Sequence, residues 1–122
     1  MAEWTPQELA ELERANETQV AGRRVDGSSR TLTIVWQVVV DGILYLRSAR
    51  GVDGQWYRGV ARNYEGFLQW GRNEPRPVTF TLDDSRDAAI DAAYTAKYGR
   101  GPATDAITSA ISNATTMRVD PR

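Results

Sequence analysis

The stretch that decides the fold is TLTIVWQVVVDGILYLRSARG, residues 31–51. Residues 31–40 alternate with a period of two, which is typical of a β-strand. One face would carry Leu32, Ile34, Trp36, Val38 and Val40. The other face is also largely apolar, as in a barrel or a central strand. Asp41-Gly42 predicts a type I′ turn, so residues 43–49 should form the antiparallel partner.

Shorter elements are expected on either side of this hairpin. The capping box Thr5-Pro6-Gln7-Glu8 predicts a helix over residues 5–16, and residues 18–25 predict a strand. Residues 55–60 suit either a strand or a short helix. Residues 67–71 and 78–82 predict two more strands around a Pro75-Arg76-Pro77 turn.

The C-terminal third is expected to hold helices over residues 84–98 and 103–112 and a closing strand over residues 115–119. The barrel strands would then occupy residues 18–82. We therefore predict that residues 1–122 form one α+β domain with about six strands and about three helices.

Composition excludes several classes of chemistry. The chain has 14 Arg and one Lys, with no Cys and no His. Thiolate or imidazole zinc sites, haem held through His or Cys, Ser-His-Asp triads and CxxC redox centres are therefore impossible. Ionic chemistry must use carboxylates, hydroxyls, Arg, Lys97 or a bound cofactor.

The charge distribution is uneven. The formal net charge of −1 argues against a nucleic-acid partner. Residues 21–76, however, hold nine Arg against five acidic residues. This excess either faces an anionic small ligand or is solubilising surface charge. The pair Arg23-Arg24 is likewise either a solvated strand end or a second anion contact.

No membrane partner is expected. The longest apolar run, residues 32–46, is interrupted by Gln37 and Asp41 and falls short of the ~20 residues that span a bilayer. Residues 1–4 lack the basic and apolar regions of a signal peptide. The expected location is the cytoplasm.

The strongest candidate site is the segment RSARGVDGQWYR, residues 47–58. A strand end delivers Arg47, Ser48 and Arg50 to a Gly-rich turn at Gly51, where free N–H groups, a hydroxyl and guanidinium groups can bind phosphate oxygens. The next residues, Trp56, Tyr57 and Arg58, add an aromatic pair and another cation. A purely structural role for the segment is an equally open interpretation.

These motifs carry a family resemblance. Trp36, VVVDGILYLRSARG, WYRG, VTFTL and AIDAAYTAKYG, in this order, resemble the flavin- and deazaflavin-binding split β-barrel superfamily. The chain is most similar to a bacterial family of this length known as a domain of unknown function, and the resemblance spans about residues 4–121.

The resemblance implies a six-stranded antiparallel split barrel with three peripheral helices, assembled as a homodimer. FMN or a deazaflavin would lie in a groove between the subunits. The residues implied near its phosphate and ring are Arg47, Ser48, Arg50, Gly51, Trp56, Tyr57 and Arg58. The sequence departs from the family in having no Lys in the phosphate-binding segment, with Arg58 as the nearest substitute. Some superfamily members bind no flavin.

Three functions remain open. The first is an oxidoreductase-like protein that acts on a small organic substrate, with Tyr57 or Tyr45 donating a proton. The second is a cofactor-free cyclase or isomerase that uses Glu65, Asp26 or Tyr64 as acid or base. The third is a ligand-binding module without catalysis.

Two other groups of residues have structural interpretations that we favour. The acidic residues Asp83, Asp84, Asp87 and Asp91 suit capping and solvation of a helix start better than a metal site, and no metal is expected. Lys97 could form a Schiff base, but its place near a helix C-terminus favours interaction with the helix dipole.

Overall fold

The computed structural model describes residues 3–122 of the chain. Residues 1–2 lie outside this range, so the expectation of no signal peptide at residues 1–4 falls partly outside the described residues. The elements in chain order are α1 (Pro6–Arg14), β1 (Thr18–Gly22), β2 (Thr33–Val35), β3 (Gln37–Val40), β4 (Ile43–Leu46), the 3-10 helix η1 (Gly51–Asp53), α2 (Gln55–Val60), β5 (Glu65–Gln69), β6 (Arg76–Leu82), α3 (Asp87–Tyr98), α4 (Pro102–Ile107), α5 (Ala110–Asn113) and β7 (Met117–Pro121).

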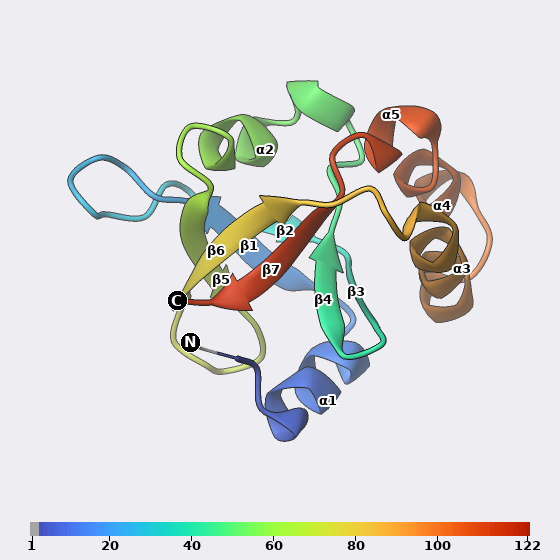
Figure 1. Cartoon of the computed structure of the whole chain (residues 1–122), viewed down its shortest axis with the longest axis horizontal. Coiled ribbons are helices and arrows are strands. Elements are labelled where there is room, and N and C mark those ends of the chain that lie inside the picture. The colour runs from blue at the N-terminus through green and yellow to red at the C-terminus, as the bar shows by residue number, and fades with distance from the viewer. Residues whose placement is uncertain (1–2) are drawn as a thin grey trace.

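The described strands form one antiparallel, seven-stranded sheet in the order β2-β1-β5-β6-β7-β4-β3 (Figure 1). The edge strands are therefore β2 and β3. These two strands are consecutive in the chain and only Trp36 separates them. The sheet must curve until its two edges meet near Trp36, which gives the expected split barrel with its split between β2 and β3.

The single long strand expected over residues 31–40 is wrong. Val35 pairs with Thr18 of β1, whereas Gln37 pairs with Leu46 of β4. The chain thus passes from one edge of the sheet to the other at Trp36. The side-chain alternation continues across this point because both halves are barrel strands. This break is why the described sheet has seven strands rather than the expected six.

The helices also differ from expectation, with five α-helices within residues 3–122 where three were expected. The ambiguous segment 55–60 is helix α2. The helix expected over 103–112 is two short helices, because α4 ends at Ile107 and Ser109 caps α5 by accepting the Ser112 N–H at 3.3 Å. Across the described chain, no helix combines the length and the apolar character needed to cross a membrane.

Several boundaries shift because of local turns. The strand expected over 18–25 ends at Gly22, since a turn follows in which the Gly27 N–H donates to the Arg24 carbonyl. Arg76 and Pro77 lie inside β6, so the turn predicted at residues 75–77 is wrong. The capping box of α1 is confirmed, with the Thr5 hydroxyl accepting the Glu8 N–H.

Two clusters of buried side chains form the core. The barrel interior takes inward-facing residues such as Val20, Leu44, Leu68 and Val119, and α1 and α2 close its ends with further apolar side chains. The outer face of β3 and β4 packs on α3 and α4 through Val38, Tyr45, Ile90, Tyr94 and Ile107. Successive residues of β4 therefore serve different clusters, as the period of two requires.

Candidate functional site

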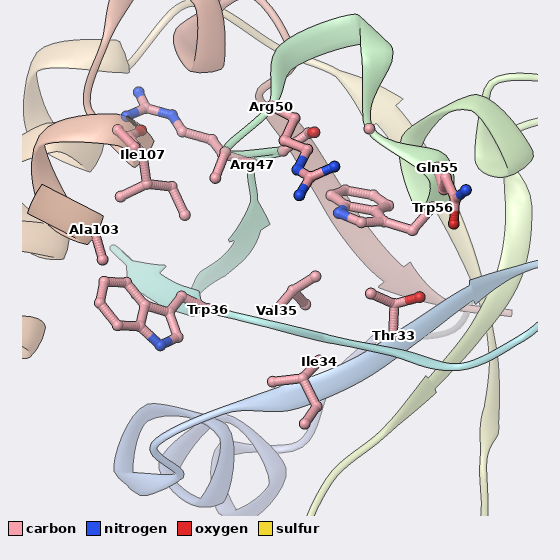
Figure 2. Close-up of a pocket in the computed structure, with 14 residues that line it drawn as sticks. Thr33, Ile34, Val35, Trp36, Arg47, Arg50, Gln55, Trp56, Ala103 and Ile107 are labelled. Atoms are coloured by element: carbon pink, nitrogen blue, oxygen red, sulfur yellow. Dashed lines mark hydrogen bonds between the residues drawn. The ribbon is translucent and has the colours of Figure 1, made fainter.

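A pocket of about 540 Å³ opens at the split of the barrel (Figure 2). It lies between β2, the chain that follows β4, the start of α2 and one side of α4. Its walls are mainly apolar and include Val35, Trp36, Trp56 and Ile107. Arg50 and Trp56 lie on one side in Figure 2, with Trp36, Ala103 and Ile107 on the other.

Close backbone packing after β4 shapes this pocket. The Ser48 N–H donates to the Thr115 hydroxyl at 2.9 Å, and the Ser48 carbonyl accepts the Gly51 N–H at 2.9 Å. A Cβ on Gly54 would lie only 2.3 Å from the Ser48 hydroxyl oxygen. The start of α2 therefore packs closely on the Ser48 side chain, and Trp56 follows two residues later in the pocket wall.

A second pocket of about 360 Å³ adjoins the first and shares Thr33, Gln55 and Trp56 with it. It is lined by four arginines, two from the β1–β2 connection and two from α2 and its C-terminal end: Arg24, Arg30, Arg58 and Arg62. We call this the arginine pocket. The ion pairs within residues 3–122 use other arginines, so none of these four has a carboxylate partner there.

The four guanidinium groups therefore create a local positive potential. The Nε atom of Arg30 is buried without a hydrogen-bond partner among the described residues. The NH1 group of Arg24 donates to the Ser29 carbonyl at 2.6 Å, which fixes its side chain. Guanidinium groups arranged in this way suit the oxygens of a phosphate or carboxylate.

A contact between two glycines brings the two arginine pairs together. A Cβ on Gly22 would lie 2.7 Å from the carbonyl carbon and oxygen of Gly59. The Arg30 side chain also lies against Gly59, where a Cβ would be 2.9 Å from its Cδ atom. Helix α2 can approach β1 this closely only because both positions lack side chains.

The residues predicted from the sequence divide between these pockets. Ser48, Arg50 and Trp56 line the first pocket, while Trp56 and Arg58 line the arginine pocket. Gly51 lies behind the wall against Ile111, in a backbone conformation with φ of +67° that favours glycine.

Arg47 reaches the first pocket, but its guanidinium group is engaged elsewhere. The residue is 1% exposed. It forms ion pairs with Asp91 and, at 3.1 Å, with Asp87, and its Nε donates to the Thr116 hydroxyl at 2.9 Å. Figure 2 shows the side chain running away from Arg50 and Trp56 toward Ile107. Its charge is balanced by α3.

The two tyrosines predicted as proton donors line neither pocket. Tyr45 is buried between β4 and α3, and Tyr57 is buried in the barrel core. Burial raises the pKa of both phenols, so both stay protonated at neutral pH.

The other acids and bases considered from the sequence also lie outside both pockets. Glu65 pairs with Arg122 at 2.7 Å. Hydrogen bonds from Ser28 lower the pKa of Asp26. Tyr64 lies after α2 with a positive φ. Within residues 3–122, no group of three or more carboxylates is arranged to hold a metal ion. Lys97 lines neither pocket, and its amine donates to the carbonyls of Leu12 and Gln37.

Sequence reasoning missed Arg30, Arg62 and Trp36 as pocket residues. The excess of arginine in residues 21–76 is the available signal, and the sequence does offer Arg24 as a possible anion contact. The segments that carry these arginines are far apart in the sequence, so only the fold shows which of them converge.

Comparisons with known proteins agree with this architecture. The sequence profile of DUF2255, described as an uncharacterized protein conserved in bacteria, matches residues 8–119. No curated protein sequence matches the chain.

Solved structures match over nearly the whole chain. HutZ, the heme storage protein from Vibrio cholerae, is 12% identical with a TM-score of 0.64 and coverage of 98% of this chain and 91% of its own. An F420 reductase is 19% identical with a TM-score of 0.57 and coverage of 93% and 91%. A conserved hypothetical protein from Mycobacterium tuberculosis is 14% identical with a TM-score of 0.58 and coverage of 97% and 79%. At these identities the likeness concerns the fold.

Proposed function

The chain belongs to the bacterial family DUF2255, and we propose that its split β-barrel binds FMN or a phosphorylated deazaflavin across the two adjoining pockets. The ring would occupy the first pocket and the phosphate the arginine pocket. One observation carries the proposal: Thr33, Gln55 and Trp56 line both pockets, so one ligand can span them.

The residues present fit such a group. The first pocket, at about 540 Å³, lies within the ~300–1,000 Å³ typical of small-molecule sites. Its apolar walls and the Trp56 indole suit a planar ring system. The arginine pocket offers four cations without carboxylate partners among the described residues, which suits a phosphate dianion. Arg50 adds an exposed cation beside the ring.

The same geometry favours an oxidoreductase-like protein over a cofactor-free cyclase. A bound flavin or deazaflavin supplies hydride transfer, which protein side chains do not perform. A cyclase would need an acid or base at the substrate. The candidates Glu65, Asp26 and Tyr64 line neither pocket. The chain's own residues would instead bind the cofactor, orient its ring and exclude water.

We also propose that the site lies at the interface of a homodimer. The first pocket opens beside the edge strand β2. Ile34 of that strand is 57% exposed and lines the same pocket, so a second copy that covers β2 would bury Ile34 and the pocket mouth together.

Equilibrium titration tests the cofactor. FMN and 5-deaza-FMN should bind saturably. Quenching of the protein's tryptophan fluorescence measures this binding. Riboflavin, which lacks the phosphate, should bind more weakly by at least about 1.5 kcal/mol, the lower end for a charge-assisted hydrogen bond. Arg58→Ala should weaken FMN binding by about 1.5–3 kcal/mol for the same reason.

The matched control is Arg72→Ala, which removes an exposed arginine that lines neither pocket. It should leave the FMN affinity unchanged. The proposal fails if neither FMN nor 5-deaza-FMN binds saturably. It also fails if Arg58→Ala and Arg50→Ala both bind FMN as tightly as the wild type.

A further inference from the structure

The first pocket has two chemically different ends. One end, beside Trp56, adjoins the arginine pocket. The other is formed by Trp36 and three residues of α4, and none of these four lines the arginine pocket: Trp36, Ala103, Ala106 and Ile107. We call this end the Trp36 subsite. Figure 2 shows Trp36 and Ala103 across the cavity from Trp56.

The Trp36 ring is held in a fixed position. It stacks on Tyr98 with 4.0 Å between ring centroids and an angle of 4° between the ring planes. The Tyr94 hydroxyl donates to the Trp36 carbonyl at 2.9 Å, and the Tyr98 hydroxyl donates to the Gln37 carbonyl at 3.1 Å. Tyr98 covers one side of the indole, while the indole still lines the pocket. The subsite therefore offers an aromatic surface that is ordered before a ligand arrives.

The Trp36 subsite carries no net charge. Its four side chains are apolar, and the neighbouring Arg47, which donates to the Ile107 carbonyl at 3.3 Å, pairs with Asp87 and Asp91 of α3. An ionised ligand placed here would lose its hydration without gaining a partner, which is strongly unfavourable. Ala103 and Ala106 leave room for a ring on the α4 side.

We propose that the Trp36 subsite binds the second reactant, an uncharged, planar, apolar molecule that stacks on the Trp36 indole. The inference rests on the proposed function, because it assigns the cofactor to the Trp56 end and the reactant to the opposite end. The two ends then select by different chemistry: phosphate at the arginines, and a neutral ring at Trp36.

A matched pair of probes tests the subsite by equilibrium dialysis, namely neutral 2-acetylnaphthalene and anionic naphthalene-2-carboxylate, each in the presence of saturating FMN. The neutral probe should bind at least about tenfold more tightly, since only the anion must give up its hydration. Ala106→Trp, which fills the subsite, and Trp36→Leu, which removes the stacking surface, should each weaken the neutral probe about tenfold or more. Ala92→Trp, on an exposed position of α3, is the control and should bind like the wild type.

Fluorescence titration of FMN on the same proteins separates the two proposals. Ala106→Trp should keep FMN affinity within about twofold, since Ala106 lies at the Trp36 end of the first pocket, whereas the ring is assigned to the Trp56 end and the phosphate to the arginine pocket. If FMN binds normally but both subsite variants bind the neutral probe like the wild type, the subsite is overturned alone. Equal binding of the anionic probe also overturns it. If FMN does not bind, the proposed function fails. The neutral probe is then dialysed against the same variants without FMN. If both subsite variants bind it as the wild type does, the subsite is overturned as well.

Discussion

At the scale of single residues, Arg47 links β4 to α3. Its buried guanidinium group pairs with Asp87 and Asp91 and receives further support from Thr116. Arg47→Met would leave both carboxylates without their cation, although these carboxylates are 29% and 35% exposed and can partly rehydrate. We expect the free energy of unfolding to fall by about 3 kcal/mol, measured by urea denaturation at neutral pH.

Arg50→Met is the control, because Arg50 is exposed and forms none of the ion pairs within residues 3–122. Its unfolding free energy should stay within about 0.5 kcal/mol of the wild type. Equal stability of the two variants would show that the contacts of Arg47 with Asp87 and Asp91 do not stabilise the fold. Arg47 would then again be a candidate ligand-binding residue.

Arg47 also shows the limit of prediction at this scale. The alternation of residues 43–49 puts Tyr45 and Arg47 on one face, and although β4 ends at Leu46, both side chains do face α3. Asp87 and Asp91 lie four residues apart, so one helix face presents both. The sequence did not show that this helix face covers that strand face, so Arg47 was predicted to bind a ligand.

At the scale of elements, two side chains attach α1 to the sheet. The Gln37 amide of β3 donates to the carbonyls of Leu12 and Ala15 at 2.8 and 2.9 Å. The Lys97 amine of α3 donates to the carbonyls of Leu12 and Gln37 at 3.3 and 3.1 Å. Lys97 thus joins three elements, which explains its position better than a Schiff base does.

Lys97 should make stability depend on pH. Burial lowers the pKa of the Lys97 amine to about 8 from its ordinary value of 10.5. The unfolded chain therefore binds more protons between these values, and stability rises with pH there. The neutral amine still has two N–H donors for its two carbonyls. We expect the unfolding free energy to increase by about 0.5–1 kcal/mol from pH 7.5 to 9.0, after allowing for solvent screening.

The control is Lys97→Met, whose urea-derived unfolding free energies should lack this increase. The pH range stays below 10 because burial raises the pKa of Tyr98 to about 12, which reverses the trend once unfolded tyrosines ionise. A wild-type slope matched by Lys97→Met would contradict the assignment of the effect to Lys97.

The elements that the sequence predicts correctly are those defined by contacts between residues close together in the chain. Thr5 and Glu8 define the start of α1 through contacts three residues apart, and the Asp41-Gly42 turn fixes the β3–β4 pairing. The break at Trp36 depends on which distant strands pair with each half, so alternation alone could not reveal it. Ser109 caps α5 directly after the C-cap Thr108 of α4, and the spacing of apolar residues over 103–112 did not reveal this boundary.

At the scale of the whole molecule, the site lies at the split of the barrel between β2 and β3. The edge strand β2, the chain after β4, and α4 surround the first pocket, and the Gly22–Gly59 contact places the arginine pocket beside it. The resemblance predicted the split barrel, but the convergence of Arg24, Arg30, Arg58 and Arg62 depends on how α2 sits on β1. That packing depends on the absence of side chains at Gly22 and Gly59, and no sequence motif indicates such a contact.

The exposed edge strand leads to a prediction about assembly. Light scattering at micromolar concentration should give a mass near twice the 13.6 kDa of the chain. Ile34→Arg should shift the mass toward one chain, because it places a charge on the apolar surface of β2 that we propose a second copy covers. Since the first pocket opens beside this strand, FMN binding should weaken by about tenfold in the same variant. Leu82→Arg, at another exposed apolar position, is the control and should keep both the mass and the FMN affinity. A wild-type mass near one chain, together with tight FMN binding, would place the complete site within a single subunit.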